Sequence, residues 1–220
     1  MTIERIERRS AAQRIVRDEA TPEADLTPRA QAMLAALNGE VEILRRELRS
    51  AQERLALAER AADLDQLLPI LNRRAFVRAL SRQIGAVARY GTPASLLYCD
   101  LDGFKRINDR YGHAGGDAVL SHFAKILSAN VRESDIVGRI GGDEFGIVLA
   151  HANAAQAAKK ANTLIAALTK EPTEWNGAPI AVCFSFGTFE LCASESAETA
   201  MMRADEAMYA QKRAAQGAAQ

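Results

Sequence analysis

The sequence predicts a mixed α/β domain of the α+β type preceded by a long helical coiled coil. Apolar residues recur at alternating spacings of three and four between residues 34 and 62. From about residue 70 onward, short apolar runs of strand length alternate with longer stretches of helical character. At 220 residues the chain has room for one domain of ordinary size plus an extension.

The composition is that of a soluble globular protein, with 48% apolar and 25% charged residues. Lysine plus arginine balances aspartate plus glutamate at 28 each, so net charge gives no case for nucleic-acid or membrane-surface binding. No apolar run reaches the roughly 18 residues of a spanning helix, and the first thirty residues lack the apolar core of a signal peptide. The odd number of cysteines predicts free thiols, with Cys99 and Cys183 buried. We therefore expect a cytoplasmic protein without a membrane span or a nucleic-acid partner.

The first thirty residues form a charged segment that two Thr-Pro pairs interrupt. Thr21 and Thr27 each precede a proline, which is typical of an N-cap followed by proline in the first helical position. The second pair opens the heptad segment. We therefore divide the chain into a charged, partly helical segment over 1–29, a coiled coil over 30–66 and a globular domain over 67–220.

The coiled-coil segment carries four sustained heptads with apolar or alanine side chains at the a and d positions. In a parallel dimer each g residue faces the e residue five positions further along the partner. Two of the three such pairs are opposite in sign and none repels. This pattern favours a parallel homodimer, and the alternative is a single amphipathic helix folded back on its own domain. The a positions are Leu34, Val41, Leu48, Leu55 and Ala62, the d positions are Leu37, Leu44, Ala51 and Ala58, and the g–e pairs are Glu40–Arg45, Glu47–Gln52 and Arg54–Glu59.

The rest of the chain is predicted to form a sheet flanked by helices. Two apolar runs around a Gly-Gly turn predict a hairpin, and the Pro- and Gly-containing stretch 172–179 predicts a loop. The order of the elements implies helices on one side of the sheet. The expected helices cover 72–90, 115–130, 153–169 and 197–214, and the expected strands cover 94–99, 136–140, 145–149 and 180–191.

Two pairs of acidic residues lie at the ends of the predicted strands. Asp100 and Asp102 follow the strand over 94–99, and Asp143 and Glu144 occupy the hairpin turn. Carboxylates at a strand end and in an adjacent turn can converge on one point, and such oxygen ligands suit Mg²⁺, which also recruits substrate phosphates. The alternative is that these are solvated turn residues.

The stretch after the first acidic pair adds groups suited to a nucleotide. Phe104 and Lys105 offer backbone N–H groups and a cation to phosphates. Asn108 and Asp117 lie on either side of a glycine-rich loop, and together they match the edge of guanine, with its O6 acceptor and its N1 and N2 donors. The sequence has no Walker-type phosphate loop, so a nucleotide would be held in another way.

A series of motifs resembles one known family. The segment Arg139-Ile140-Gly141-Gly142-Asp143-Glu144-Phe145 carries the signature that names the GGDEF family of diguanylate cyclases. The resemblance covers roughly residues 65–216 in the family's order and spacing. It extends through Asn72-Arg73-Arg74-Ala75-Phe76, Asp100-Leu101-Asp102-Gly103-Phe104-Lys105-Arg106-Ile107-Asn108-Asp109, Gly112-His113, Gly116-Asp117, Ser185-Phe186-Gly187, Ala204-Asp205-Glu206-Ala207-Met208-Tyr209 and Lys212.

The resemblance implies a palm-like fold related to nucleotidyl cyclases and polymerases. It implies that two GTP molecules condense into cyclic di-GMP, and that two domains face each other because each holds one GTP. Two Mg²⁺ (or Mn²⁺) ions per active site would be bound by Asp100, the Leu101 carbonyl, Asp143 and Glu144. Asp143 and Glu144 are the implied catalytic residues. The implied substrate-binding residues are Asn108, Asp117 and His113 for guanine, and Phe104, Lys105 and Lys212 for the triphosphate.

A further motif resembles the family's product-binding inhibitory site. Arg132 and Asp135 form an Arg-x-x-Asp that ends shortly before the signature. Arginine stacks on guanine and grips phosphate, while aspartate accepts from the guanine edge. The resemblance implies feedback inhibition by cyclic di-GMP, and the alternative is a helix-end ion pair.

Two departures from the family pattern bear on activity. Leu68-Pro69 replaces the family's Thr-Gly and stiffens the turn into the domain. Gln216 stands where the family often has a phosphate-binding arginine, so we expect weaker GTP binding. Two other classes of function remain open, namely a non-catalytic module that binds cyclic di-GMP or GTP, and a coiled-coil scaffold. The retained acidic residues favour the enzyme.

Overall fold

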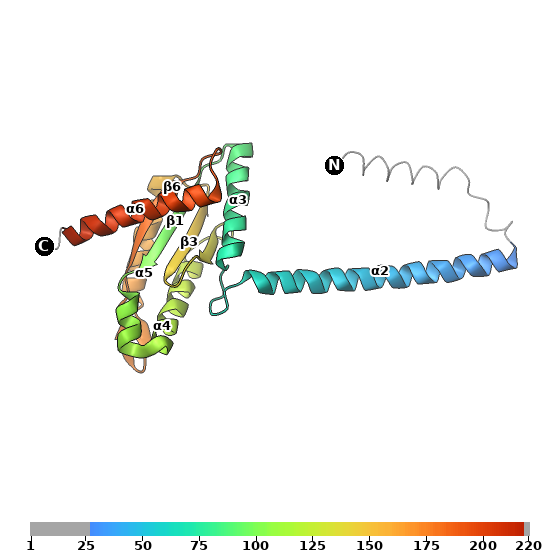
Figure 1. Cartoon of the computed structure of the whole chain (residues 1–220), viewed down its shortest axis with the longest axis horizontal. Coiled ribbons are helices and arrows are strands. Elements are labelled where there is room, and N and C mark those ends of the chain that lie inside the picture. The colour runs from blue at the N-terminus through green and yellow to red at the C-terminus, as the bar shows by residue number, and fades with distance from the viewer. Residues whose placement is uncertain (1–26, 218–220) are drawn as a thin grey trace. The chain divides into compact units, whose positions relative to one another are not determined.

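The structure is a computed structural model that describes residues 27–217, except for the side chains of 55–61 and 214–217 (Figure 1). It divides into two compact units with a boundary between Glu59 and Arg60. The cap predicted at Thr21, and the helical content predicted for the first 26 residues, lie outside the described residues. No helix of the described part is both long enough and apolar enough to cross a bilayer.

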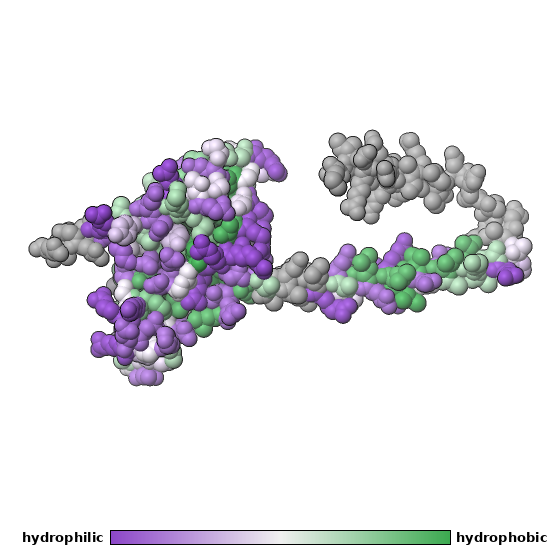
Figure 2. Space-filling model, in the orientation of Figure 1, coloured by the Kyte–Doolittle hydropathy of each residue, from purple (hydrophilic) through white to green (hydrophobic). Residues whose placement is uncertain are grey.

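Helix α2 (Pro28–Asp63) accounts for the described part of the first unit. Its start is as predicted, because the Ala30 N–H donates to the Thr27 hydroxyl at 3.4 Å and proline occupies the first helical position. The apolar residues at the first heptad positions form an exposed stripe, visible along α2 in Figure 2. Their exposed fractions run from 41% to 58%, for Leu34, Leu37, Val41, Leu44 and Leu48.

The second unit is built on a four-stranded antiparallel sheet in the order β2-β3-β1-β6. The predicted hairpin is formed by β2 and β3, and β1 lies between β3 and β6. The strands are β1 (Ala94–Leu101), β2 (Ile136–Arg139), β3 (Glu144–Ala150) and β6 (Phe184–Glu190). The mixed α+β fold class is confirmed.

Helices cover both faces of this sheet, so the prediction of helices on one side was wrong. Leu97 and Cys99 of β1 join a core with α4 (Phe104–Ala129) and α5 (Ala154–Lys170). Leu96 and Tyr98 point to the opposite face, into a core with α3 (Arg73–Tyr90) and α6 (Ala197–Gly217). Alternate side chains of a strand point to opposite faces, so the uninterrupted apolar run of β1 is buried on both faces of the sheet.

Three local predictions differ from the structure. Residues 172–179 form a short hairpin of β4 (Thr173–Trp175) and β5 (Ala178–Ile180) rather than a loop, with the predicted long strand beginning only at Phe184. Helix α4 begins well before residue 115, because a left-handed Gly103 turns the chain directly from β1 into the helix. Cys183 is exposed rather than buried, since it lies in the segment between β5 and β6.

Candidate functional site

The site forms around the C-terminal end of β1. Asp100 lies opposite Glu144 of β3 on one side and Ser185 of β6 on the other. Its carboxylate forms an ion pair with the Lys212 ammonium group of α6. Two neighbouring strands and a C-terminal helix therefore bring polar groups to one point at the strand end.

The Gly-Gly turn between β2 and β3 places the second acidic pair beside this point. The N–H groups of Ile140 and Gly141 donate to the Glu144 carbonyl at 2.8 and 3.2 Å, and the Leu101 N–H donates to the Asp143 carbonyl at 3.2 Å. A Cβ on Gly141 would lie 2.1 Å from Glu144 Oε2. Only glycine at this position leaves the Glu144 carboxylate where it is.

The linker that leads into the domain also helps to hold this turn, through the side chain of Arg139. The Arg139 guanidinium donates to the carbonyl of Gly141 at 3.1 Å, and to that of Gly142 at 2.7 Å. It also forms an ion pair with Asp65 at 3.2 Å, in which both side chains are less than one fifth exposed. Asp65 Oδ1 in turn accepts from the N–H of Leu68 at 3.1 Å. The departure at Leu68-Pro69 thus lies in a turn that stays tied to the signature.

Burial and neighbouring negative charge raise the pKa of both acidic residues of the turn. Burial raises the pKa of Asp143, and the negative charge of Asp100 raises it further. Burial also raises the pKa of Glu144, whereas a hydrogen bond from the buried Tyr98 hydroxyl lowers it. The hydrogen bond to Asp100 raises the pKa of Lys212. The site therefore concentrates negative charge that favours a cation.

Asp102 has a different environment from Asp100. Its Oδ1 accepts a hydrogen bond from the Ser185 hydroxyl at 2.8 Å and lies 3.6 Å from Lys212 Nζ. Its backbone N–H donates to the Cys183 carbonyl at 2.9 Å. Asp102 therefore anchors the start of α4 to the segment that leads into β6.

The residues predicted to read guanine lie on either side of a kink in α4. Gly112 has a φ of 73° and a ψ of 172°, so the expected glycine-rich loop is a break within a helix. A Cβ on Gly116 would lie 1.9 Å from Asn108 Oδ1. The Asn108 amide therefore packs directly on the backbone next to Asp117, and the kink brings the two predicted residues together.

The other predicted substrate-binding residues on α4 are partly buried or exposed. Phe104 is partly buried against the core and begins α4 two residues after Asp102. Lys105, His113 and Asp117 have exposed side chains. The side chain at Gln216 lies outside the described residues.

The donor set at the end of β1 fits a divalent cation that shares its ligands with a substrate. Within the described residues, no group of three or more His, Cys, Asp or Glu side chains could by itself hold a metal ion. Mg²⁺ commonly uses one or two carboxylates together with phosphate oxygens and water. Asp100 and Asp143 supply oxygen donors of that kind, and the Lys212 contact shows that a positive charge is accommodated against Asp100.

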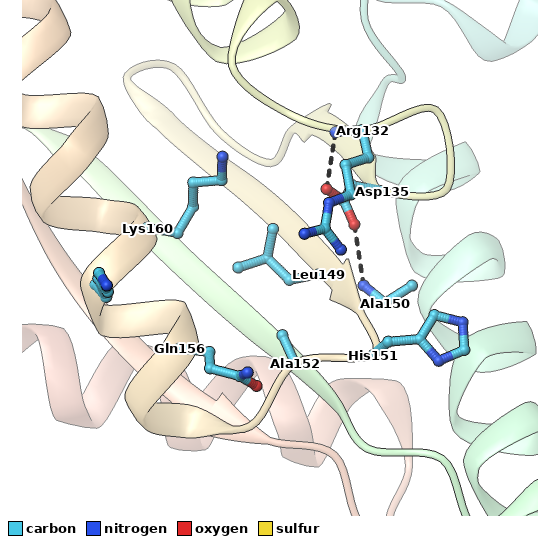
Figure 3. A pocket seen from close by; sticks show the side chains of 9 residues that line it. Arg132, Asp135, Leu149, Ala150, His151, Ala152, Gln156 and Lys160 are labelled. Atoms are coloured by element: carbon cyan, nitrogen blue, oxygen red, sulfur yellow. Dashed lines mark hydrogen bonds between the residues drawn. The ribbon is translucent and has the colours of Figure 1, made fainter.

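A second pocket is lined by both residues of the predicted Arg-x-x-Asp motif (Figure 3). Its volume is about 270 Å³. Asp135 accepts from the Arg132 N–H at 2.9 Å and from the Ala150 N–H at 3.1 Å. These contacts use backbone donors, so the two motif side chains do not form the helix-end ion pair that was the alternative. The basic and polar residues around them are His151, Gln156, Lys159 and Lys160.

Several residues of these sites were not found from the sequence. Tyr98 lies in an apolar strand segment, and the only sign of a polar role in the sequence is its position two residues before Asp100, on the same face of the strand. Asp65 lies at the start of the stretch that resembles the family, but its partner Arg139 is 74 positions away. The lysines of the second pocket lie on α5, and no local motif marked them.

Comparison with known proteins matches the sequence of this chain to one family. The family model described as "Diguanylate cyclase, GGDEF domain" matches residues 62–218. Diguanylate cyclase TpbB of Pseudomonas aeruginosa is 34% identical over 206 residues, which is 91% of this chain and 46% of that protein. Diguanylate cyclase DgcP of the same species is 30% identical over 198 residues, covering 90% of this chain and 29% of DgcP. The chain thus spans less than half the length of either relative.

A solved structure extends the similarity to the helical segment. The coiled coil and GGDEF domain of DgcB from Caulobacter crescentus, solved in complex with c-di-GMP, superimposes with a TM-score of 0.72 at 27% identity. The match covers 81% of this chain and 95% of that one. With the signature, the family match and the shared fold in agreement, this chain belongs to the GGDEF-domain family of diguanylate cyclases.

Proposed function

We propose that this protein is a diguanylate cyclase that condenses two GTP molecules into cyclic di-GMP and two pyrophosphates. The observation that carries the proposal is the meeting of Asp100, Asp143 and Glu144 at the end of β1, beside Lys212. In the reaction each 3′-hydroxyl attacks the α-phosphate of the other GTP. A P–O bond forms, the bond to pyrophosphate breaks, and the hydroxyl proton leaves.

The acidic residues of the turn carry the chemical step. Burial and Asp100 raise the pKa of Asp143, which makes its carboxylate a better proton acceptor for the attacking hydroxyl. Lys212, which contacts Asp100 in the single chain, would exchange that contact for a phosphate oxygen of the substrate. Glu144, the first residue of β3, would support cation binding at the same site.

Two divalent cations, Mg²⁺ or Mn²⁺, are proposed for each active site. Asp100, the Leu101 carbonyl, Asp143 and Glu144 would hold them. When bound, the ions would offset charge on the phosphoryl group and favour ionisation of the hydroxyl.

Substrate recognition is assigned to α4. Asn108 and Asp117 would read the guanine edge across the Gly112 kink, with His113 lining the same site. Phe104 and Lys105 at the start of the helix would contact the triphosphate, because the first N–H groups of a helix favour anions.

A homodimer would bring two half-sites together. The apolar stripe of α2 is exposed in the single chain. A coiled coil over the predicted segment 30–66, whose helix ends at Asp63, would bury that stripe against a second copy. Residues 67–220 would then form the catalytic domain. The charged segment 1–29 remains without an assigned role. The cytoplasm supplies GTP and suits the free cysteines Cys99, Cys183 and Cys192.

Product would inhibit the enzyme at the second pocket. Arg132 is exposed there and its guanidinium is not paired with Asp135. Lys159 and Lys160 add positive charge to the same pocket, which suits the two phosphates of cyclic di-GMP. This pocket is separate from the end of β1.

The test is incubation of the purified full chain with GTP and Mg²⁺, followed by chromatographic separation of the products. Wild-type protein should yield cyclic di-GMP and pyrophosphate, while Asp143→Ala should yield neither and retain the wild-type melting temperature within a few degrees. Binding of cyclic di-GMP by a folded wild-type dimer without any turnover would select the non-catalytic module instead.

A further inference from the structure

Tyr98 occupies an enclosed position directly behind the acidic turn. It lies on the same face of β1 as Asp100, two residues earlier, and it is only 6% exposed. Its neighbours across the sheet are glycines on both sides, Gly146 of β3 and Gly187 of β6. Because glycine has no side chain, neighbouring elements can approach this face of the sheet on both sides of the Tyr98 ring.

Other elements occupy the space that these glycines leave. A Cβ on Gly146 would lie 2.3 Å from the Phe76 ring of α3. A Cβ on Gly187 would lie 2.0 Å from the Ala204 carbonyl of α6. The Phe76 ring and the α6 backbone therefore wall in the Tyr98 ring. On this face Glu144 lies diagonally across the β1–β3 ladder from Tyr98, and each of the two side chains affects the pKa of the other.

The Glu144 carboxylate is held between two surfaces. On one side Oε2 lies against Gly141, where a Cβ would come within 2.1 Å. On the other side it faces Tyr98, its diagonal neighbour on β1. Asp143 precedes β3 and has no such neighbour in the ladder between β1 and β3. The two acidic residues of the turn are therefore held differently.

We propose that Tyr98 is a positioning residue that fixes the Glu144 carboxylate toward the cation-binding point at the end of β1. The inference rests on the proposed function, because it concerns how the site takes up Mg²⁺ together with nucleotide. The hydroxyl supplies one donor to Glu144 and so leaves its remaining lone pairs to a cation. Without that donor the side chain loses a fixed orientation, and each cation-binding event has to restore it.

The test uses Tyr98→Phe, which keeps the ring and removes only the hydroxyl. Calorimetry on the full-length protein would measure binding of the α,β-methylene analogue of GTP, from which pyrophosphate cannot leave, across a range of Mg²⁺ concentrations and in EDTA. We expect Tyr98→Phe to raise the Mg²⁺ concentration for half-maximal enhancement of binding about tenfold. Affinity in EDTA should stay within about twofold of wild type. Tyr90→Phe, at the exposed end of α3, is the matched control and should match wild type in both measurements.

A second background separates positioning from general packing. In Glu144→Gln protein, adding Tyr98→Phe should change the Mg²⁺ dependence by less than about twofold, because the hydroxyl acts through Glu144. An equal shift in both backgrounds, or a loss of affinity in EDTA, would overturn the inference. If analogue binding by the wild type depends on Mg²⁺ and Tyr98→Phe shows the same dependence, the inference about Tyr98 is overturned while the proposed function stands. A wild type whose analogue binding ignores Mg²⁺ would overturn the proposed function as well.

Discussion

Replacing Gly116 with alanine tests whether Asn108 reads the guanine base. The new Cβ would lie 1.9 Å from Asn108 Oδ1, whereas ordinary contact begins at 3.4 Å. The two atoms must separate by the difference, ~1.5 Å, and a hydrogen bond to the base does not survive such a displacement. Leaving a buried polar edge without its partner costs about 1–3 kcal/mol. We therefore expect the Kd for a non-hydrolysable GTP analogue to rise about tenfold.

The stability of the variant should change little. Gly116 has no left-handed φ, and alanine in a helix interior is favoured over glycine by about 1 kcal/mol, which offsets part of the strain. Gly85→Ala in α3 is the matched control, because a Cβ there meets nothing within 4 Å. Calorimetric titration and thermal unfolding of both variants measure the two effects separately. If Gly116→Ala bound the analogue as tightly as wild type and Gly85→Ala do, the guanine site would lie elsewhere.

Three further predictions concern the dimer, the second pocket and the core. Leu44→Lys with Leu48→Lys should yield monomers by light scattering, with little activity at low protein concentration; full activity in a proven monomer would contradict the dimer mechanism. Arg132→Ala should raise the cyclic di-GMP concentration for half-maximal inhibition about tenfold, because a charge-assisted contact is lost, and unchanged inhibition would exclude this pocket. Gly187→Ala should destabilise the fold by about 1–3 kcal/mol, because the new Cβ meets the Ala204 carbonyl at 2.0 Å. A urea midpoint equal to that of wild type would refute that packing.

Local signals explain why much of the fold was predictable. The Thr27 cap, the Asn72 cap of α3 and the turn between β2 and β3 each depend on a few adjacent residues. The sequence also contains a signal for helices on both faces of the sheet, although the prediction placed them on one side. β1 is apolar at consecutive rather than alternate positions, which is typical of a strand buried on both faces. The β4–β5 hairpin has only three residues per strand, too few for an alternating pattern to stand out.

The acidic residues of the site were predictable, but their partners were not. Asp100 and Asp143 could be inferred from their places at a strand end and in a turn. The contact between Asp100 and Lys212 spans 112 positions, and the family motif rather than any local pattern pointed to the lysine. The enclosure of Tyr98 beside Glu144 depends on glycines in two other strands, each of which makes room for a different helix. Such arrangements exist only once the sheet has formed.

The ion pairs of the described residues differ in how much they constrain the site. Arg45 and Glu42 of α2 form a pair at 2.7 Å, but both side chains are more than half exposed, and surface pairs of this kind contribute little. The Arg139–Asp65 pair is largely shielded from solvent, and the same guanidinium also holds the two glycine carbonyls of the signature turn. A displacement of Asp65 would therefore strain the contacts that keep the acidic turn in place. The linker that enters the domain and the signature turn are joined through the Arg139 side chain, which gives a physical route by which the geometry of the linker can influence the turn.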